Sequence, residues 1–321
     1  MEYRKFGKTG LEVSEVTLGT WVFGHGQDTW KEADDEESIR VMQEAVDKGI
    51  NHIATAAYGN AEEVVGKGLK GIRDRVYIAD STGADSLSLK DMENKLAGAL
   101  KALQSDYLDF YYLHYPNKGF CKMIENMNSL KEKGKVKYLG VSNFSQPQLR
   151  EAMKIAPIDF IQSPYNLLWR EIEPELLPFC KQENIAVTTY SSIAQGLLTG
   201  KYKSYDDVTK SGNNILKRNV LCRENIFPIA LEVVKLIENI AEKYGKTSSQ
   251  VASKWLLHQE AVTTVIVGVR TIAQLEDNLG TIGWDLEEED WKRLSKKGEE
   301  VSKLINYDVS MWGGKYYRGI N

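Results

Sequence analysis

Short apolar runs alternate with longer amphipathic ones along almost the whole chain, and this alternation limits the folds that the chain can adopt. Each apolar run has the length and the residue types of a buried strand. The segments between them carry apolar residues three and four positions apart, as in helices that pack by one face. The expected strands span residues 15–20, 51–55, 75–81, 107–114, 136–143, 159–163, 185–191 and 263–268. Clear helical patterns fill residues 35–49, 88–103 and 227–245.

This repeat predicts an α/β fold, a closed (β/α)8 TIM barrel, because right-handed crossovers place each new strand beside the last. A doubly wound open sheet is the rival fold, but no Gly-x-Gly-x-x-Gly turn follows the first strand. The 321 residues suit one barrel with added loops, so we expect a single domain over residues 1–321.

Three segments fall outside the repeat. Residues 3–14 alternate around a Lys-Thr-Gly turn and predict a β-hairpin that caps the bottom of the barrel. Residues 200–225 are polar and weakly periodic, which predicts a long loop over the barrel mouth. The C-terminal residues 306–321 are rich in aromatics and glycine, and we expect them to form a second lid with little helix.

The composition bounds the partners and the compartment. Charged residues make up 27% of the chain and sum to −4. Their signs are well mixed, so a small-molecule partner is expected, with no nucleic acid and no membrane. No apolar run approaches the roughly 18 residues of a membrane span. Cys121, Cys180 and Cys222 stand at unrelated spacings, which predicts reduced thiols in a cytoplasmic protein and no metal site; a reactive thiol is the alternative.

In a barrel the functional groups lie at the carboxyl ends of the strands. Most residues at these ends are polar or aromatic, and although each alone has an ordinary structural explanation, the set indicates a site. Its members are Gly19, Thr20, Trp21, the stretch 54–58, Ser81, His114, Ser142, Asn143, Gln162, Tyr190, Ser191 and the stretch 268–271.

The eighth strand ends in a glycine turn that leads into a helix carrying Arg270 and Thr271. Free backbone N–H groups and the helix dipole favour a phosphate there, and the arginine adds two hydrogen-bond donors. A polar helix start with a solvated arginine is the alternative. The same turn and helix supply further cofactor candidates, namely Gly268, Gln274, Asp277 and Asn278.

The seventh strand and its neighbours indicate the other end of a nucleotide. The ring of Tyr190 is placed to stack on a flat heterocycle, and small residues after it let backbone amides approach a pyrophosphate. Three uncharged side chains at adjacent strand ends suit a neutral amide such as a nicotinamide carboxamide, although tying loops together is their alternative role. The candidates here are Ser142, Asn143, Gln162, Ser191, Gln195, Gly196 and Leu198.

These segments resemble those of the aldo-keto reductase family. The similarity covers nearly the whole length and keeps the family's order, from LGTW through DYLDFYYLH, GKVKYLGVSNFS, YNLLWREIEPELLPFC and YSSIAQGLLTGKY to IVGVRTIAQLEDNLG. The resemblance implies a barrel that binds NADP(H) in an extended form without a Rossmann domain. It implies carboxamide contacts from Ser142, Asn143 and Gln162 and stacking by Tyr190. It also implies that the adenosine 2′-phosphate end is held by Arg270, Thr271, Gln274 and Asn278.

The resemblance implies a catalytic set that is only half present. Family members use an aspartate, a tyrosine, a lysine and a histidine, in which the lysine lowers the pKa of the proton-donating tyrosine. Tyr58 and His114 match, whereas Ala54 stands at the aspartate position and Ser81 at the lysine position. The loop from Ala54 to Tyr58 is also one residue shorter than usual. Because both charged residues are missing, no buried charge is left without its partner.

This loss predicts weak acid–base catalysis. A tyrosine titrates near 10 in water and is a weaker acid without an adjacent cation. Losing matched acid–base catalysis costs about 10²- to 10⁴-fold in rate. His114, whose reference pKa lies near neutrality, is the alternative proton donor. Asp80 should point outward by strand alternation, and His52 should be a hydrogen-bonded core residue.

Three functions remain open from the sequence. The first is an NADP(H)-dependent oxidoreductase with a rebuilt acid–base site, acting on a sugar-like or other hydroxylated carbonyl compound. The second is a redox-neutral epimerase or lyase that uses a bound nicotinamide transiently. The third is a cofactor-sensing or regulatory barrel, because a fold does not establish catalysis. Candidate substrate contacts are His25, Asp28, Trp30, Trp169 and the aromatic C-terminus.

Overall fold

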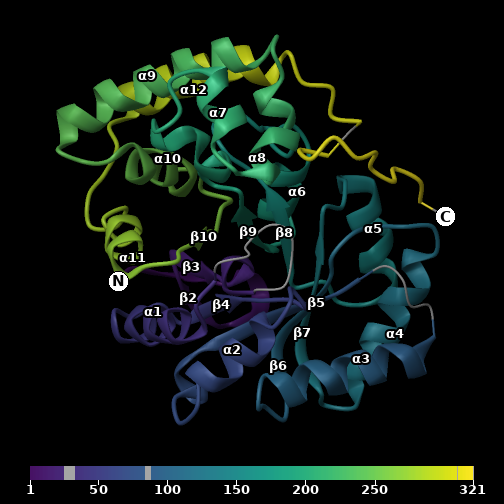
Figure 1. Ribbon diagram of the computed structural model, residues 1–321. Helices are drawn as coiled ribbons and strands as arrows, with labels where there is room; N and C mark the ends of the chain where they lie inside the picture. Colours follow the sequence, from purple (N-terminus) through teal and green to yellow (C-terminus); the bar gives the residue numbers. More distant parts are fainter. Residues whose placement is uncertain (25–32, 84–87, 309, 321) are drawn as a thin grey trace.

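A computed structural model describes residues 1–24, 33–83, 88–308 and 310–320. All eight expected strands are present: β3 (Val16–Gly19), β4 (His52–Ala54), β5 (Tyr77–Thr82), β6 (Leu108–Leu113), β7 (Val136–Ser142), β8 (Phe160–Pro164), β9 (Ala186–Tyr190) and β10 (Thr264–Gly268). They pair in parallel and close into a barrel in the order β10-β3-β4-β5-β6-β7-β8-β9 (Figure 1). The predicted (β/α)8 TIM barrel is confirmed.

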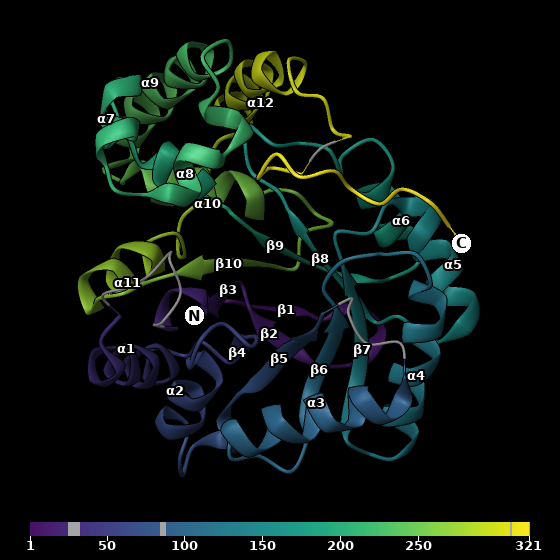
Figure 2. The same ribbon diagram turned by 45° about the vertical axis from the view of Figure 1, so that its right-hand side comes forward.

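Helices surround the barrel (Figure 2). The three clearest helical patterns form α1 (Asp35–Asp47), α3 (Leu89–Ala102) and α9 (Phe227–Tyr244). Each places its apolar residues against the strands, as the three- and four-residue spacing predicts. The other longer helices are α2 (Ala61–Gly68), α4 (Phe120–Glu132), α5 (Gln146–Ile155), α6 (Leu176–Gln182), α10 (Ser248–Leu257), α11 (Ile272–Leu279) and α12 (Glu288–Ser302).

The segment 200–225, which the sequence predicts to be a loop, contains two short helices, α7 (Tyr205–Lys210) and α8 (Asn214–Arg218). A capping box begins α7, where the Ser204 side chain accepts a hydrogen bond from the backbone of Asp207. Each of these two helices has only a few residues and buries one apolar side chain. Helices this short show no clear periodicity in a sequence, which explains the error.

The N-terminal hairpin caps the amino end of the barrel, as predicted. Its strands β1 (Tyr3–Lys5) and β2 (Glu12–Ser14) pair antiparallel. Between them, the fully buried ring of Phe6 lies 4.5 Å from the ring of Phe110. These rings belong to the cluster that fills the barrel interior: Phe6, Val13, Ala79, Phe110, Tyr112, Phe160 and Ala186. The hairpin therefore closes the barrel at the amino ends of the strands. The opposite end, where the strands have their carboxyl ends, is called the mouth below.

His52 is a core histidine, as expected. Its Nδ1 lies 2.9 Å from the hydroxyl oxygen of Thr17, and its side chain is buried beside Phe6 and Phe110. Burial lowers the pKa of His52 to about 3. The imidazole is therefore uncharged in the folded protein at neutral pH.

The C-terminal segment returns across the molecule from α12 to the side of α5 (Figure 2). The buried amide of Gln148, in the first turn of α5, donates hydrogen bonds to the carbonyl oxygens of Tyr317 at 2.7 Å and Gly319 at 3.0 Å. The backbone N–H of Val220 bonds the carbonyl oxygen of Met311 at 2.9 Å. As predicted, the described part of this segment contains little helix.

Cys121, Cys180 and Cys222 are free thiols. Burial raises the pKa of Cys180 and of Cys222 to about 12, so neither is a thiolate nucleophile at neutral pH. Among the described helices, none combines the length and the hydropathy that crossing a membrane requires.

Candidate active site at the barrel mouth

Tyr58 and His114, the two residues expected to carry the chemistry, meet at the mouth. Tyr58 lies in the loop after β4, and His114 follows β6. Their ring centroids are 6.4 Å apart, and the ring of Trp21 lies 6.0 Å from that of Tyr58. The shortened loop thus still delivers the tyrosine to the mouth.

A close contact between two backbones sets the position of Tyr58. A Cβ on Gly24 would come within 1.9 Å of the Tyr58 carbonyl oxygen. The same oxygen accepts a hydrogen bond of 3.0 Å from the backbone of Ala61, the first residue of α2. The Tyr58 loop is therefore held between the turn after β3 and the start of α2, and only glycine fits at position 24.

Burial determines the protonation of both groups. It raises the pKa of Tyr58 well above its usual value, and it lowers the pKa of His114 to about 4. The pKa of His114 therefore lies below its reference value near neutrality, because desolvation disfavours the imidazolium. At neutral pH, Tyr58 keeps its proton and His114 is uncharged, so the two groups offer neutral hydrogen-bond donors to a substrate.

Ala54 and Ser81 face the barrel interior beside this pair. Ala54 pairs in register with Ala79, and Ser81 pairs with Tyr112. Ala79 and Tyr112 belong to the interior cluster, and alternate residues of a strand share a face, so Ser81 points inward as well. Small neutral side chains thus occupy both places at which the resemblance implies charged ones.

Asp80 faces outward, as expected, into the layer between the barrel and the helices. Its side chain is fully buried; Oδ1 accepts a 2.7 Å hydrogen bond from the backbone of Ser81, and the carboxyl group of Glu62 lies beside it. Burial, and next the carboxyl group of Glu62 on α2, raise the pKa of Asp80 well above its usual range. Asp80 is therefore protonated at pH values where an exposed aspartate is charged.

Replacing this carboxyl group by an amide (Asp80→Asn) should stabilise the protein at pH 8 by about 1–3 kcal/mol. Because folding raises the pKa, the folded state holds a proton that the unfolded state has lost, and wild-type stability falls as the pH rises above the unfolded value of 3.8. Asparagine does not titrate, so its advantage should shrink toward pH 4.5. Urea unfolding at both pH values measures this; a variant less stable than wild type at pH 8 would contradict it.

The three residues expected to hold a carboxamide lie together but are not equivalent. The Asn143 amide nitrogen donates to the His114 carbonyl oxygen at 2.9 Å and to the Ser142 hydroxyl at 3.1 Å, and its oxygen accepts from the Tyr190 hydroxyl at 2.7 Å. Asn143 is thus engaged within the protein. The hydroxyl hydrogen of Ser142 and the side-chain oxygen of Gln162 take part in no hydrogen bond with the described residues. Both groups therefore keep hydrogen-bonding capacity for a ligand, although Ser142 is fully buried in this structure and Gln162 is 7% exposed.

Three further aromatic residues lie at the mouth: Tyr115, which the sequence analysis missed, and Trp312 and Tyr316, which belong to the aromatic C-terminal segment that it named only as a whole. The Tyr316 hydroxyl lies 3.4 Å from the Asn143 side-chain oxygen, and the ring of Trp312 lies 6.1 Å from that of Trp21. Tyr115 follows His114, with ring centroids 4.6 Å apart. Tyr115 carried a usable signal, because it directly follows a residue already assigned to the mouth. Nothing in the sequence shows which residues of the C-terminal segment turn inward.

The loop after β9 has several residues in the left-handed backbone conformation. Ser191, Gln195 and Gly196 all have positive φ angles, of 58°, 53° and 92°. The Gln195 amide nitrogen donates to the Ser191 hydroxyl at 2.5 Å, and its oxygen accepts from Asn219 at 2.6 Å. Leu198 is fully buried in the hydrophobic core, so only its backbone is left for a ligand.

At the next strand end, Thr271 caps α11 and accepts a hydrogen bond from the backbone of Gln274 at 3.2 Å. The Gln274 side-chain oxygen accepts from the backbone of Arg270 at 2.8 Å, and Asn278 donates to the Gln274 carbonyl oxygen at 2.8 Å. Arg270 is exposed. Asp277, in contrast, accepts hydrogen bonds from Gln250 of α10 through its carbonyl and carboxylate oxygens, so it ties two helices together.

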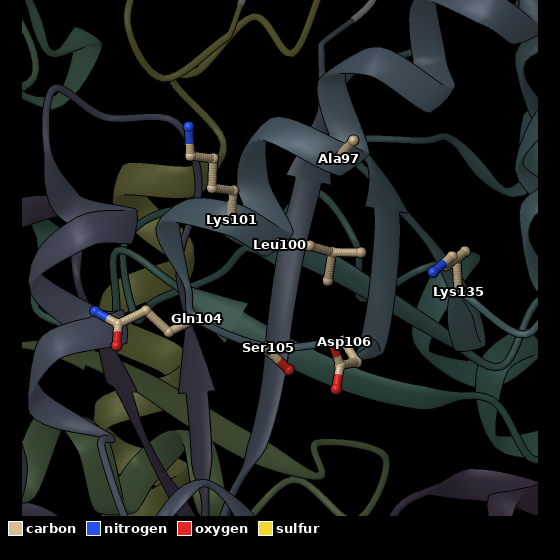
Figure 3. Close-up of a pocket in the computed structure, with 7 residues that line it drawn as sticks. All are labelled: Ala97, Leu100, Lys101, Gln104, Ser105, Asp106 and Lys135. Carbon is tan, nitrogen blue, oxygen red and sulfur yellow. The ribbon is translucent and has the colours of Figure 1, made fainter.

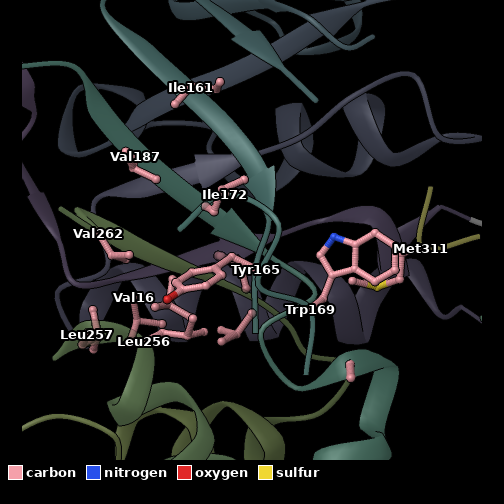
Figure 4. Close-up of a cluster of buried hydrophobic side chains, with 14 of the residues drawn as sticks. Val16, Ile161, Tyr165, Trp169, Ile172, Val187, Leu256, Leu257, Val262 and Met311 are labelled. Carbon is pink, nitrogen blue, oxygen red and sulfur yellow. The ribbon is translucent and has the colours of Figure 1, made fainter. Parts of the chain in front are cut away.

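Trp169, expected among the substrate contacts, does not line the mouth. It is fully buried in the core beside Met311 (Figure 4), and its ring packs edge-on against Tyr307 at 5.0 Å. Its indole therefore packs against the C-terminal segment on the side that faces the core. His25, Asp28 and Trp30 lie outside the described residues.

A surface hollow of about 400 Å³ lies near the amino ends of β6 and β7, away from the mouth, and Figure 3 shows the residues that line it. The end of α3 and the segments that precede β6 and β7 form it, with Lys101, Asp106 and Lys135 among its lining. Conserved chemistry in such barrels belongs to the carboxyl ends of the strands, so we place no active site in this hollow.

Comparison with known proteins decides the family. The model of the aldo/keto reductase family matches residues 15–299. The chain is 34% identical over 315 residues to the aldo-keto reductase YhdN of Bacillus subtilis (strain 168), covering 92% of this chain and 93% of that protein. The chain belongs to the aldo-keto reductase family. The family's nicotinamide cofactors therefore become the ligands to test against the mouth.

Two further aldo-keto reductase relatives differ in the cofactor that their descriptions name. One is the NADH-specific methylglyoxal reductase of Escherichia coli (strain K12), 27% identical over 92% of this chain and 98% of that protein. The other is the crystal structure of an aldo/keto reductase from Klebsiella pneumoniae in complex with NADP and acetate. It superposes with a TM-score of 0.72 at 25% identity, covering 90% of this chain and 93% of that one.

The mouth of this aldo-keto reductase fits a nicotinamide dinucleotide. Gly19 and Gly268 pair in register where β3 meets β10. Gly268 is exposed there, whereas Gly19 is buried and a Cβ on it would lie 2.7 Å from the side chain of Ile266. The buried Oδ1 of Asn278 has no hydrogen-bond partner among the described residues, as expected for a group that awaits one. The available groups of Ser142 and Gln162 match the acceptor and the donor of a carboxamide.

Proposed function

We propose that this aldo-keto reductase is an NADP(H)-dependent oxidoreductase that interconverts a carbonyl compound and its alcohol. The observation that carries the proposal is the mouth itself, where groups suited to a carboxamide adjoin two neutral hydrogen-bond donors. Ser142 and Gln162 would hold the nicotinamide, and the partly exposed ring of Tyr190 would stack on it. Thr20 and Trp21 would line the same end from β3, with Gly19, Gly268 and the loop after β9 along the diphosphate.

A bound nicotinamide supplies the hydride for this reaction. The protein orients the carbonyl group and supplies the proton. The Tyr58 hydroxyl and an imidazole N–H of His114 both donate hydrogen bonds toward the carbonyl oxygen, which polarises the bond before transfer. We assign proton delivery to Tyr58, because the pKa of His114, about 4, leaves too little imidazolium at neutral pH.

The missing Asp–Lys pair makes this site slow in our account. With Ala54 and Ser81 in the two places, no cation lies beside Tyr58 to lower its pKa, and the phenol is a poor acid. The rate should accordingly lie about 10²- to 10⁴-fold below that of a matched acid–base site. It should also change little between pH 6 and pH 8, because neither Tyr58 nor His114 titrates there.

NADP is the cofactor we favour over NAD, because Arg270 stands at the N-terminus of α11. A guanidinium and the free N–H groups of a helix start both favour a phosphate. A hydroxylated carbonyl compound remains the proposed substrate class, since tyrosine hydroxyls and indole rings surround the mouth. The three free thiols fit the reducing cytoplasm expected for this protein.

The redox-neutral alternative gains no support from the protonation of the site. Epimerisation or elimination needs a general base with a pKa near the working pH. Burial lowers the pKa of His114 to about 4 and raises that of Tyr58, so one group is a weak base and the other holds its proton. The reductase therefore accounts better for the mouth than the lyase does.

The proposal is tested by titrating the protein with NADPH and with NADH and following cofactor fluorescence. A panel of aldehydes and sugars is then added to the bound complex while absorbance at 340 nm is recorded. We expect tighter binding of NADPH, followed by slow oxidation with at least one hydroxylated aldehyde. Binding without oxidation would favour a sensing role, and binding of neither nucleotide would overturn the cofactor assignment.

Gly24→Ala tests the placement of Tyr58. The added methyl group would overlap the Tyr58 carbonyl, so the loop must move and the rate of carbonyl reduction should fall by about 10- to 100-fold. NADPH affinity should change much less than the rate, since the added methyl group would meet Tyr58 and Ala61. Gly98→Ala is the matched control, because no atom lies within 4 Å of its Cβ position. Equal rates for the two variants would contradict the role of Tyr58.

A further inference from the structure

We infer that Tyr112 is a positioning residue that fixes the side-chain amide of Gln162 so that its oxygen faces the nicotinamide carboxamide. This inference rests on the proposed function, and neither the resemblance nor the family assignment supplies it. It follows from three side chains on the inner face of the barrel: Ser81 of β5, Tyr112 of β6 and Gln162 of β8.

The strand register places these side chains within reach of one another. Ser81 lies directly beside Tyr112, and Tyr112 pairs on its other side with Gly140 of β7. The ring of Phe160 from β8 fills the space over Gly140, where a Cβ would lie 2.4 Å from it, and the ring of Tyr112 lies 5.8 Å from that of Phe160. Tyr112 can thus extend past β7 toward β8, where Gln162 stands one inward position beyond Phe160.

The Tyr112 hydroxyl determines the direction in which the hydrogen bonds among these three side chains run. Its oxygen accepts a hydrogen bond of 3.3 Å from the Gln162 amide nitrogen, and Ser81 is its polar neighbour in the strand register. A phenol has one hydrogen to donate. With the Gln162 nitrogen already donating to Tyr112, we assign that hydrogen to Ser81, the neighbouring side chain on β5.

This direction matters because an amide has two unlike ends. Gln162 is 7% exposed and Tyr112 is 2% exposed, so the network is largely shielded from water. Holding the amide nitrogen toward Tyr112 turns the amide oxygen toward the mouth, where it accepts from the NH₂ of a carboxamide. Without the Tyr112 hydroxyl, the Gln162 amide is free to turn and offer either end.

The same geometry explains how the space at position 81 is used. A longer residue at 81 would meet the Tyr112 hydroxyl, its neighbour in register. The uncharged side chains of Ser81, Tyr112 and Gln162 therefore occupy the inner surface of the barrel at which the resemblance implies a lysine. In this protein that surface serves cofactor orientation in place of proton transfer.

Tyr112→Phe tests the inference through cofactor discrimination. The probes are NADP and its 3-acetylpyridine analogue, in which a methyl ketone replaces the carboxamide and its NH₂ donor. Wild type should bind NADP about 10-fold more tightly than the analogue, as expected for one well-placed hydrogen bond. In the variant this ratio should fall to about 2-fold, mainly because NADP binding weakens.

Two matched variants separate orientation from packing. Tyr111→Phe removes the same hydroxyl from the next residue, which is equally buried, faces outward and contacts Thr82; it should keep the wild-type ratio. Ser81→Ala removes the acceptor that holds the Tyr112 hydrogen, so it should lower the ratio in the same direction as Tyr112→Phe. Adding Tyr112→Phe to Gln162→Met should cause no further change in the ratio.

The outcomes distinguish this inference from the proposed function. A wild-type ratio in Tyr112→Phe, or equal weakening of both probes, would overturn the positioning role while leaving NADP binding intact. If Tyr112→Phe does not fold, the ratio for Ser81→Ala decides in the same way. If the wild type binds neither probe, the proposed function fails, and the inference fails with it.

Discussion

Introducing an aspartate and a lysine together (Ala54→Asp with Ser81→Lys) is expected to raise the rate of NADPH-dependent aldehyde reduction by about 10²-fold or more. A lysine beside Tyr58 would lower the pKa of the phenol, and the aspartate would pair with the lysine so that neither charge is buried alone. The rate constant for NADPH oxidation under saturating aldehyde measures this. A new ionisation should also appear in its pH profile between pH 7 and pH 9, where the wild type shows none.

Single variants separate chemistry from stability in this test. Ser81→Lys alone buries an unpaired cation and should cost about 3–5 kcal/mol of unfolding free energy, most of which the added Ala54→Asp should restore. The neutral pair Ala54→Asn with Ser81→Met keeps similar volumes without the charges and should give none of the increase in rate. A folded charged double variant with wild-type rate would show that Tyr58 is not the proton donor or that the shortened loop holds it out of reach. Adding Tyr112→Phe would show whether the Tyr112 hydroxyl obstructs the lysine.

Arg270→Met should weaken NADPH binding by about 10- to 100-fold, because it removes a charge-assisted contact to the 2′-phosphate. NADH lacks that phosphate, so its dissociation constant should not change. Thr271 and the N-terminus of α11 remain in the variant, which is why binding should weaken without being abolished. Fluorescence titrations with both nucleotides at low and moderate salt measure the effect, and the loss should be larger at low salt.

A distant charge provides the control for Arg270. Lys101→Met removes one positive charge at the opposite end of the barrel, beside the hollow of Figure 3, and should leave both affinities unchanged. Equal weakening of NADPH and NADH in Arg270→Met would indicate that the arginine supports the loop and does not read the phosphate. Unchanged NADPH affinity would remove the basis for preferring NADP.

The barrel was predictable because its signal is repeated. Each strand buries both faces and each helix buries one, so eight pairs of apolar runs and amphipathic segments reveal the architecture even where single boundaries are off. The short helices α7 and α8 were not predictable, since one buried residue each, Val208 and Leu216, gives no periodicity. The hairpin was predictable because Phe6 and its flanking strands have the alternation that a cap on a closed core requires.

The sequence predicted those residues of the candidate site that lie at the carboxyl ends of the strands, and few others. Tyr58, His114, Ser142 and Gln162 lie at the mouth because parallel strands all end there. Trp169 was misplaced because a tryptophan after a strand is equally suited to the core, and only packing against Tyr307 and Met311 decides. The protonation of His114 was also beyond the sequence, since burial sets it. Tyr112 was missed because its role depends on neighbours in two other strands.

The central claim is that a hydride passes from bound NADPH to a carbonyl carbon at this mouth. The direct test uses NADPH carrying deuterium at C4 of the nicotinamide, prepared separately with the label on each face. We expect the alcohol product to contain one deuterium from one of the two labelled forms, with one NADP formed per alcohol. Product free of deuterium with both forms, or turnover of substrate without net loss of NADPH, would contradict the claim.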